Sequence, residues 1–103
     1  MMIMDKRNEI YELGKKVDLL QQLNCKTDNK QEILELIDSI TVYFENNDGD
    51  NTDIDYNVVY FYTKANYLTV LIEVVKTQKS NYMKAIILYR MGQRMKCYMI
   101  LLF

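Results

Sequence analysis

The fold depends on one stretch of sequence, residues 54–76, which reads IDYNVVYFYTKANYLTVLIEVVK. Apolar residues recur along it at alternating steps of four and three, the spacing of one face of an α-helix. These residues are Ile54, Val58, Phe61, Ala65, Leu68, Ile72 and Val75. Residues 64–66 include no glycine, proline or aspartate, so the sequence has no turn signal there. The stretch therefore predicts one long helix.

The other side of this helix is apolar as well. Tyr60, Tyr62, Tyr67 and Val70 lie away from the stripe, and we expect them on the outer side. A helix that is apolar nearly all round has to be covered on more than one side. This surplus of apolar surface predicts a further packing partner.

A strand interpretation of the same half of the chain is also open. In it, residues 58–63, 68–76, 84–91 and 95–103 form successive strands. Pairs of β-branched residues, such as Val58-Val59 and Val74-Val75, are typical of strands. The alternative fold is then α+β, with two N-terminal helices packed on an antiparallel sheet. We favour the helix because the strand interpretation needs a turn near residues 64–66.

Two amphipathic helices are predicted before this stretch. In residues 5–23 the apolar positions are Ile10, Leu13, Val17 and Leu20, and in residues 29–44 they are Ile33, Ile37, Ile40 and Phe44. The polar segment of residues 45–55 predicts a loop that ends in a helix cap from Thr52 or Asp53.

A fourth helix is predicted to start after Ser80 as its cap. Its apolar face is expected to hold Tyr82, Ala85, Ile86 and Tyr89. The favoured fold class is therefore all-α, a small bundle of four to five antiparallel helices. At this length, residues 1–103 are expected to form a single domain.

Residues 81–89, NYMKAIILY, resemble the second helix of a tetratricopeptide repeat. That family has an aromatic residue, an alanine that permits close helix contact, and a second aromatic residue four positions later. Here these are Tyr82, Ala85 and Tyr89. The resemblance covers one partial repeat, residues 67–95, and departs from the family pattern at Glu73 and Lys76. It implies a helical-repeat-like C-terminal half that binds protein.

Composition excludes most kinds of catalytic and metal site. The chain has no histidine, which excludes histidine-based triads and histidine-ligated metals. Cys25 and Cys97 are too few for a structural zinc site, and the three glycines are too far apart for a phosphate-binding loop. We expect no enzymatic activity, no catalytic residue, no cofactor and no metal. The two separated cysteines and the absence of a long apolar run predict a cytoplasmic protein that does not enter membranes.

Charge is divided unevenly along the chain. Residues 1–55 hold thirteen acids and six bases, whereas residues 56–103 hold one acid and seven bases. The loop of residues 45–55 has four aspartates that can face a basic partner. These are Asp48, Asp50, Asp53 and Asp55. They support the alternative function, a small acidic inhibitor or immunity-type protein that neutralises a basic enzyme. Acids would repel phosphates, so we do not expect a nucleic-acid partner.

The favoured function is a non-catalytic module that binds and regulates a protein partner by stoichiometric contact. Its binding surface is expected within the tyrosine-rich residues 56–89. The candidate partner-binding residues are Tyr60, Tyr62, Tyr67, Val70, Val74, Tyr82 and Tyr89. The apolar residues 98–103 are unusual, because chain ends are usually polar. They form either a buried last element or a contact with another protein, including a homodimer contact with a second copy.

Overall fold

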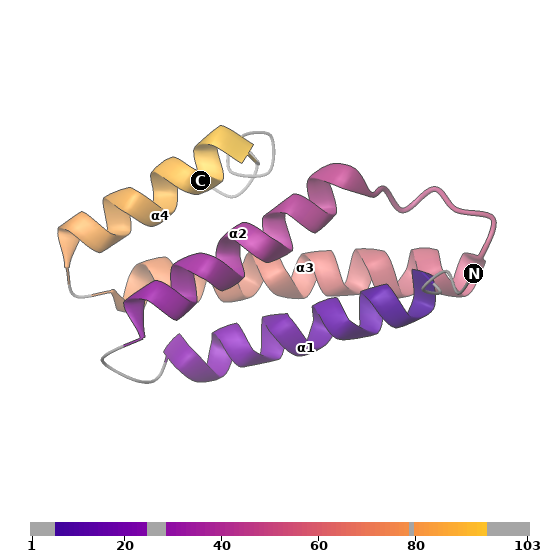
Figure 1. The fold of residues 1–103 in the computed structure, drawn as a ribbon, viewed down its shortest axis with the longest axis horizontal. Coiled ribbons are helices and arrows are strands. Elements are labelled where there is room, and N and C mark those ends of the chain that lie inside the picture. Colours follow the sequence, from indigo (N-terminus) through magenta and orange to yellow (C-terminus); the bar gives the residue numbers. More distant parts are fainter. Residues whose placement is uncertain (1–5, 25–28, 79, 95–103) are drawn as a thin grey trace.

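The computed structural model describes residues 6–24, 29–78 and 80–94, and these residues form four α-helices and no strand (Figure 1). The helices are α1 (Lys6–Asn24), α2 (Lys30–Asn46), α3 (Ile54–Thr77) and α4 (Asn81–Arg94). The all-α prediction is confirmed. The strand interpretation of residues 58–63, 68–76 and 84–91 is wrong, because all of them are helical. Residues 95–103, and with them the expected dimer contact, lie outside the described part.

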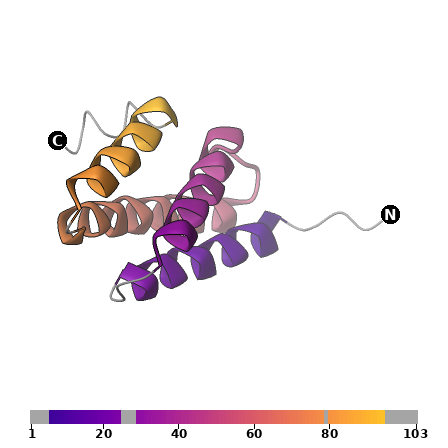
Figure 2. The same ribbon diagram turned by 60° about the vertical axis from the view of Figure 1, so that its left-hand side comes forward.

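Each helix runs roughly against the helix before it, so α1 and α3 point in the same direction (Figure 1). α1 packs against both α2 and α3. α4 runs beside α2 in roughly the same direction and contacts both α2 and α3 (Figure 2). The long helix α3 therefore has α1 on one side and α4 on another.

Two predicted caps fix the starts of α3 and α4. The Asp53 carboxylate accepts hydrogen bonds from the backbone N–H groups of Asp55 and Tyr56, at 3.1 and 3.4 Å. The Ser80 hydroxyl accepts one from the N–H of Met83 at 3.3 Å. These bonds satisfy donors that the first turn of a helix leaves without partners.

The apolar stripes predicted for α1 and α2 are confirmed as core. Their eight residues are all buried: Ile10, Leu13, Val17, Leu20, Ile33, Ile37, Ile40 and Phe44. Burial of each such side chain contributes about 1.5–3 kcal/mol relative to exposure. The buried stripes of α1 and α2 together thus form the apolar surface against which α3 packs.

The face of α3 that enters the core is opposite to the predicted one. Its buried residues are Tyr56, Tyr60, Thr63, Tyr67, Val70, Leu71 and Val74. In contrast, Ile54, Val58 and Phe61 of the predicted stripe are 73%, 64% and 58% exposed. The prediction was right about the helical spacing and wrong about which face turns inward.

Aromatic rings explain why the tyrosine face is the buried one. The Phe44 ring lies 5.3 Å from the ring of Tyr60 and 5.8 Å from that of Tyr67, so large rings fill the space between α2 and α3. Tyr67 can be buried because its hydroxyl lies 2.7 Å from Thr41 Oγ1 and donates to the carbonyl oxygen of Ile37 at 3.1 Å. A buried ring removes more apolar area from water than valine or alanine does.

α4 also turns a different face inward than predicted. Met83 and Ile87 are buried, whereas Tyr82 and Tyr89 are exposed. Ala85 is exposed too, so it does not make the close helix contact that alanine makes in a tetratricopeptide repeat. Arg90 holds α4 to α2 through an ion pair with Asp38 at 2.7 Å. The repeat-like character of this half stays a prediction.

Candidate protein-binding surface

The seven predicted partner-binding residues do not form one surface. Four are buried in the core and cannot touch a partner of the folded chain: Tyr60, Tyr67, Val70 and Val74. The other three are exposed, Tyr62 on α3 and Tyr82 and Tyr89 on α4. The predicted surface is therefore wrong for the four buried residues. On α3, the candidate surface consists instead of the residues that are exposed.

The outer face of α3 is an exposed apolar stripe. We use this name for Ile54, Val58, Phe61, Tyr62 and Ala65, all of which are exposed. The stripe continues toward the C-terminal end of α3 through Leu68, Ile72 and Val75, which are half-buried. Single exposed apolar residues are ordinary, but a contiguous apolar patch marks an interaction site. α3 therefore has an apolar face on each of two opposite sides, and the protein's own core covers one of them.

Tyr11 of α1 extends this apolar surface toward α1. It is 64% exposed and lines two neighbouring hollows of about 340 and 270 Å³ between α1 and α3, both of which also include Ile10 and Val59. Gly14 lines the second hollow, and no atom lies within 4 Å of where a Cβ at this position would be. Tyr11 is not among the residues predicted from the sequence, where its signal is an aromatic residue outside the apolar stripe of its helix.

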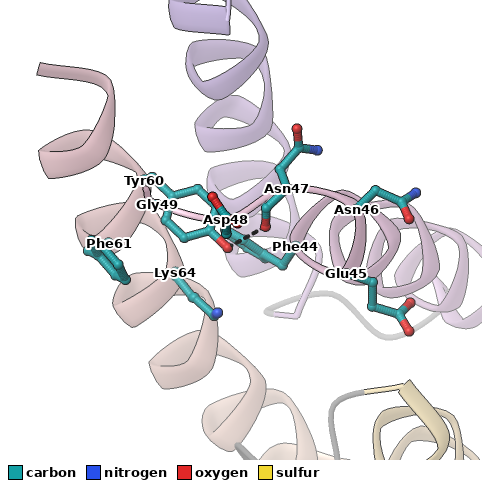
Figure 3. Close-up of a pocket in the computed structure, with 9 residues that line it drawn as sticks. All are labelled: Phe44, Glu45, Asn46, Asn47, Asp48, Gly49, Tyr60, Phe61 and Lys64. Carbon is teal, nitrogen blue, oxygen red and sulfur yellow. Dashed lines mark hydrogen bonds between the residues drawn. The ribbon is translucent and has the colours of Figure 1, made fainter. Parts of the chain in front are cut away.

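A third hollow, of about 390 Å³, lies where the end of α2 and the following loop meet α3 (Figure 3). Phe61, at the edge of the outer face, forms part of its lining. The ammonium of Lys64 lies 5.7 Å from the ring centre of Phe44 and 5.4 Å from that of Tyr60, so cation–π attraction holds it beside the rings. Partial burial lowers the pKa of Lys64.

The loop next to this hollow is held tightly against α3. The Tyr60 hydroxyl donates a hydrogen bond to the carbonyl oxygen of Asn47 at 2.7 Å (Figure 3). Burial is the main reason that the pKa of Tyr60 rises to about 12, so it keeps this proton at neutral pH. A Cβ at Gly49 would lie 2.9 Å from Cδ1 of Tyr60 and closer still to the ring of Phe61. Only glycine permits this close approach.

The four aspartates of the acidic loop are partly committed to the fold. Asp53 caps α3 and forms an ion pair with Arg7 of α1, and Asp55 lies 3.6 Å from the same guanidinium. Asp48 accepts a hydrogen bond from the N–H of Asp50 at 3.0 Å. Within the described residues, no three side chains of His, Cys, Asp or Glu lie close enough together to hold a metal ion. Because Arg7 lies beside Asp53 and Asp55, its positive charge offsets part of the negative charge of this loop. The acidic-inhibitor alternative requires that negative charge for binding a basic partner.

No protein-family model, curated protein or solved structure matches the chain. None of the helices in the described ranges combines the length and the apolar character needed to cross a membrane. The function is therefore inferred from the surface of the protein. The most distinctive part of that surface is the exposed apolar outer face of α3.

Proposed function

We propose that the chain is a non-catalytic protein-binding module that regulates its partner by stoichiometric contact through the outer face of α3. The observation that carries this proposal is the row of exposed apolar residues on the helix whose opposite face fills the core. Covering such a row removes apolar area from water, which stabilises a complex by about 25 cal/mol per Å².

The shape of this surface favours a helical partner. Its apolar residues follow one line along α3 at steps of four and three, and a second amphipathic helix can match that line along its length. Tyr11 and Tyr62 border the line and are largely exposed, so they add contact area while their hydroxyls remain available for hydrogen bonds. Aromatic residues of this kind are enriched where proteins bind one another.

Site-specific photocrosslinking in cells that express the chain tests this function. A benzophenone amino acid replaces Val58, and mass spectrometry identifies the adduct and the segment that is crosslinked. We expect adducts with a helical segment of a protein. Val42 is the matched control position, because it is a valine that is 41% exposed on α2. The proposal would be contradicted if the crosslinker at position 58 gave no adducts, or gave the same adducts as the crosslinker at position 42.

Two further positions sharpen the result. Phe61→Lys in the chain that has the crosslinker at position 58 is expected to abolish the adduct, because it places a charge in the apolar row. Phe61 is 58% exposed but its ring also packs against Tyr60, so circular dichroism has to show that the variant keeps its helical content. A crosslinker at Asp50 reports on the acidic loop. Adducts from position 50 alone would favour the acidic-inhibitor alternative instead.

A further inference from the structure

The outer face of α3 has the spacing of a coiled-coil seam. In heptad notation, Val58, Ala65 and Ile72 occupy position a, whereas Ile54, Phe61, Leu68 and Val75 occupy position d. Strict alternation of four and three is the 3.5-residue repeat of two helices that wrap around each other. The core face of α3 does not use these positions, since its buried tyrosines lie at positions 56, 60 and 67. The seam thus lies on the side of α3 opposite to the core face, with Ile54, Val58, Phe61 and Ala65 exposed, and Leu68 and Val75 also packed against the edge of the core.

The two ends of the seam carry opposite charges on the same flank. Heptad position e holds Asp55 in the first turn of α3 and Lys76 in the last turn, and both residues are exposed. In an antiparallel pair of two α3 helices, the e positions of the two copies face each other. Asp55 of each copy then lies near Lys76 of the other copy, and the symmetry of the pair creates this contact twice. Antiparallel helices also have favourably opposed macrodipoles.

We propose that the outer face of α3 binds the same face of a second copy of this chain, as an antiparallel helix pair with two-fold symmetry. This inference rests on the proposed function and names its partner. The charge pairing selects the register in which Val58 lies opposite Val75 of the other copy. In that register Phe61 lies opposite Ile72, and Ala65 lies opposite Leu68. A small residue beside a larger one near the axis lets the two helices approach closely.

A charge-swap series measured by analytical ultracentrifugation on the full chain tests this arrangement. The wild-type chain is expected to sediment as a dimer. Asp55→Lys and Lys76→Asp should each weaken dimerisation by about tenfold, because each change places like charges together at two symmetric contacts. The double variant restores opposite charges and should recover most of the affinity. Loss without recovery in the double variant would overturn the register and the proposal.

The double variant also separates association from folding. Asp55 lies 3.6 Å from Arg7 and belongs to the first turn of α3, so Asp55→Lys also weakens the fold of the single chain. Lys76→Asp adds an acid to the last turn and cannot repair that damage. A recovered dimerisation affinity in the double variant therefore reports on contacts between the two copies and not on the stability of the single chain. Thermal unfolding of all four proteins checks that each is folded under the conditions of the measurement.

Val58→Lys distinguishes this inference from the proposed function. It should convert the dimer to a monomer, whereas the matched Val42→Lys should not. A dimer that persists in Val58→Lys would mean that another surface pairs the copies, and would overturn the inference. A monomeric wild-type chain that still crosslinks from position 58 to a different protein would overturn the second-copy partner and leave the proposed function standing. A monomeric chain without such adducts would overturn both.

Discussion

Asp53 is the residue through which the acidic loop joins the rest of the fold. Its carboxylate begins α3 as the cap and contacts Arg7 on α1. The hydrogen bond from Arg7 is the main reason that the pKa of Asp53 lies below its ordinary value, and the backbone N–H groups of Tyr56 and Asp55 lower it further. The sequence predicted a cap from either Thr52 or Asp53, and the structure assigns it to Asp53. It did not predict Arg7, which is 46 residues away along the chain.

Asp53→Asn is expected to make the stability of the protein less dependent on acid pH. The pKa of Asp53 is lower in the folded state than in the unfolded state, so the charged carboxylate stabilises the fold above the unfolded value of about 3.9. That stabilisation is lost as the pH falls through the lower, folded-state pKa. The variant should therefore melt below wild type at neutral pH, and the two melting temperatures should converge in acid. Asp50→Asn is the control, and a gap that is constant with pH would refute this assignment.

The interface of α2 with α3 shows why the direction of a helix face is hard to predict. Spacing alone identified α3, but both of its sides are apolar, and spacing does not say which side faces inward. The decision depends on residues of another helix, because the Tyr67 hydroxyl donates a hydrogen bond to the carbonyl oxygen of Ile37 and forms a second hydrogen bond with the hydroxyl of Thr41. Without those partners a buried hydroxyl would cost free energy. The tyrosines were expected on the outside because they lie away from the apolar stripe of Ile54 to Val75.

Tyr67→Phe should lower the free energy of unfolding by about 1–3 kcal/mol, because it leaves the buried hydroxyl of Thr41 and the Ile37 carbonyl without this partner. Tyr62→Phe is the matched control, since Tyr62 is 75% exposed, and we expect a change within about 0.5 kcal/mol. Urea denaturation followed by circular dichroism measures both values. Equal effects at the two positions would show that the Tyr67 network contributes little to stability.

The molecule as a whole is packed unevenly. Among the side chains that the structure describes, α1, α2 and α3 share most of the buried residues, whereas α4 adds Met83 and Ile87 and the Arg90–Asp38 ion pair. Arg90 and Asp38 are both partly exposed, and such pairs contribute at most about 1 kcal/mol. Helices with few buried contacts open locally at lower cost than the rest of a domain. We therefore expect α4 to be the least firmly attached of the four helices.

Amide hydrogen exchange is expected to show this difference. The backbone N–H groups of α4 should exchange well before those in the middle of α1 and α3, because α4 can detach without unfolding the core. Ile87→Ala, which removes a fully buried side chain, should speed exchange in α4 further and leave α1 nearly unchanged. Uniform exchange across all four helices would instead mean that the domain opens as one cooperative unit.

Local information in the sequence was enough for the four helices, the caps of α3 and α4, and the apolar stripes of α1 and α2. Helical spacing and capping are properties of neighbouring residues, so they can be read along one chain. The same spacing located the row from Ile54 to Val75, which is now the candidate binding surface. Only the tertiary structure decided that the first part of this row, from Ile54 to Ala65, faces outward and that Tyr11 lies beside it. The physical reason is that burial depends on which distant groups fill the space around a ring and satisfy its hydroxyl, and residues 37, 41 and 44 do so for α3.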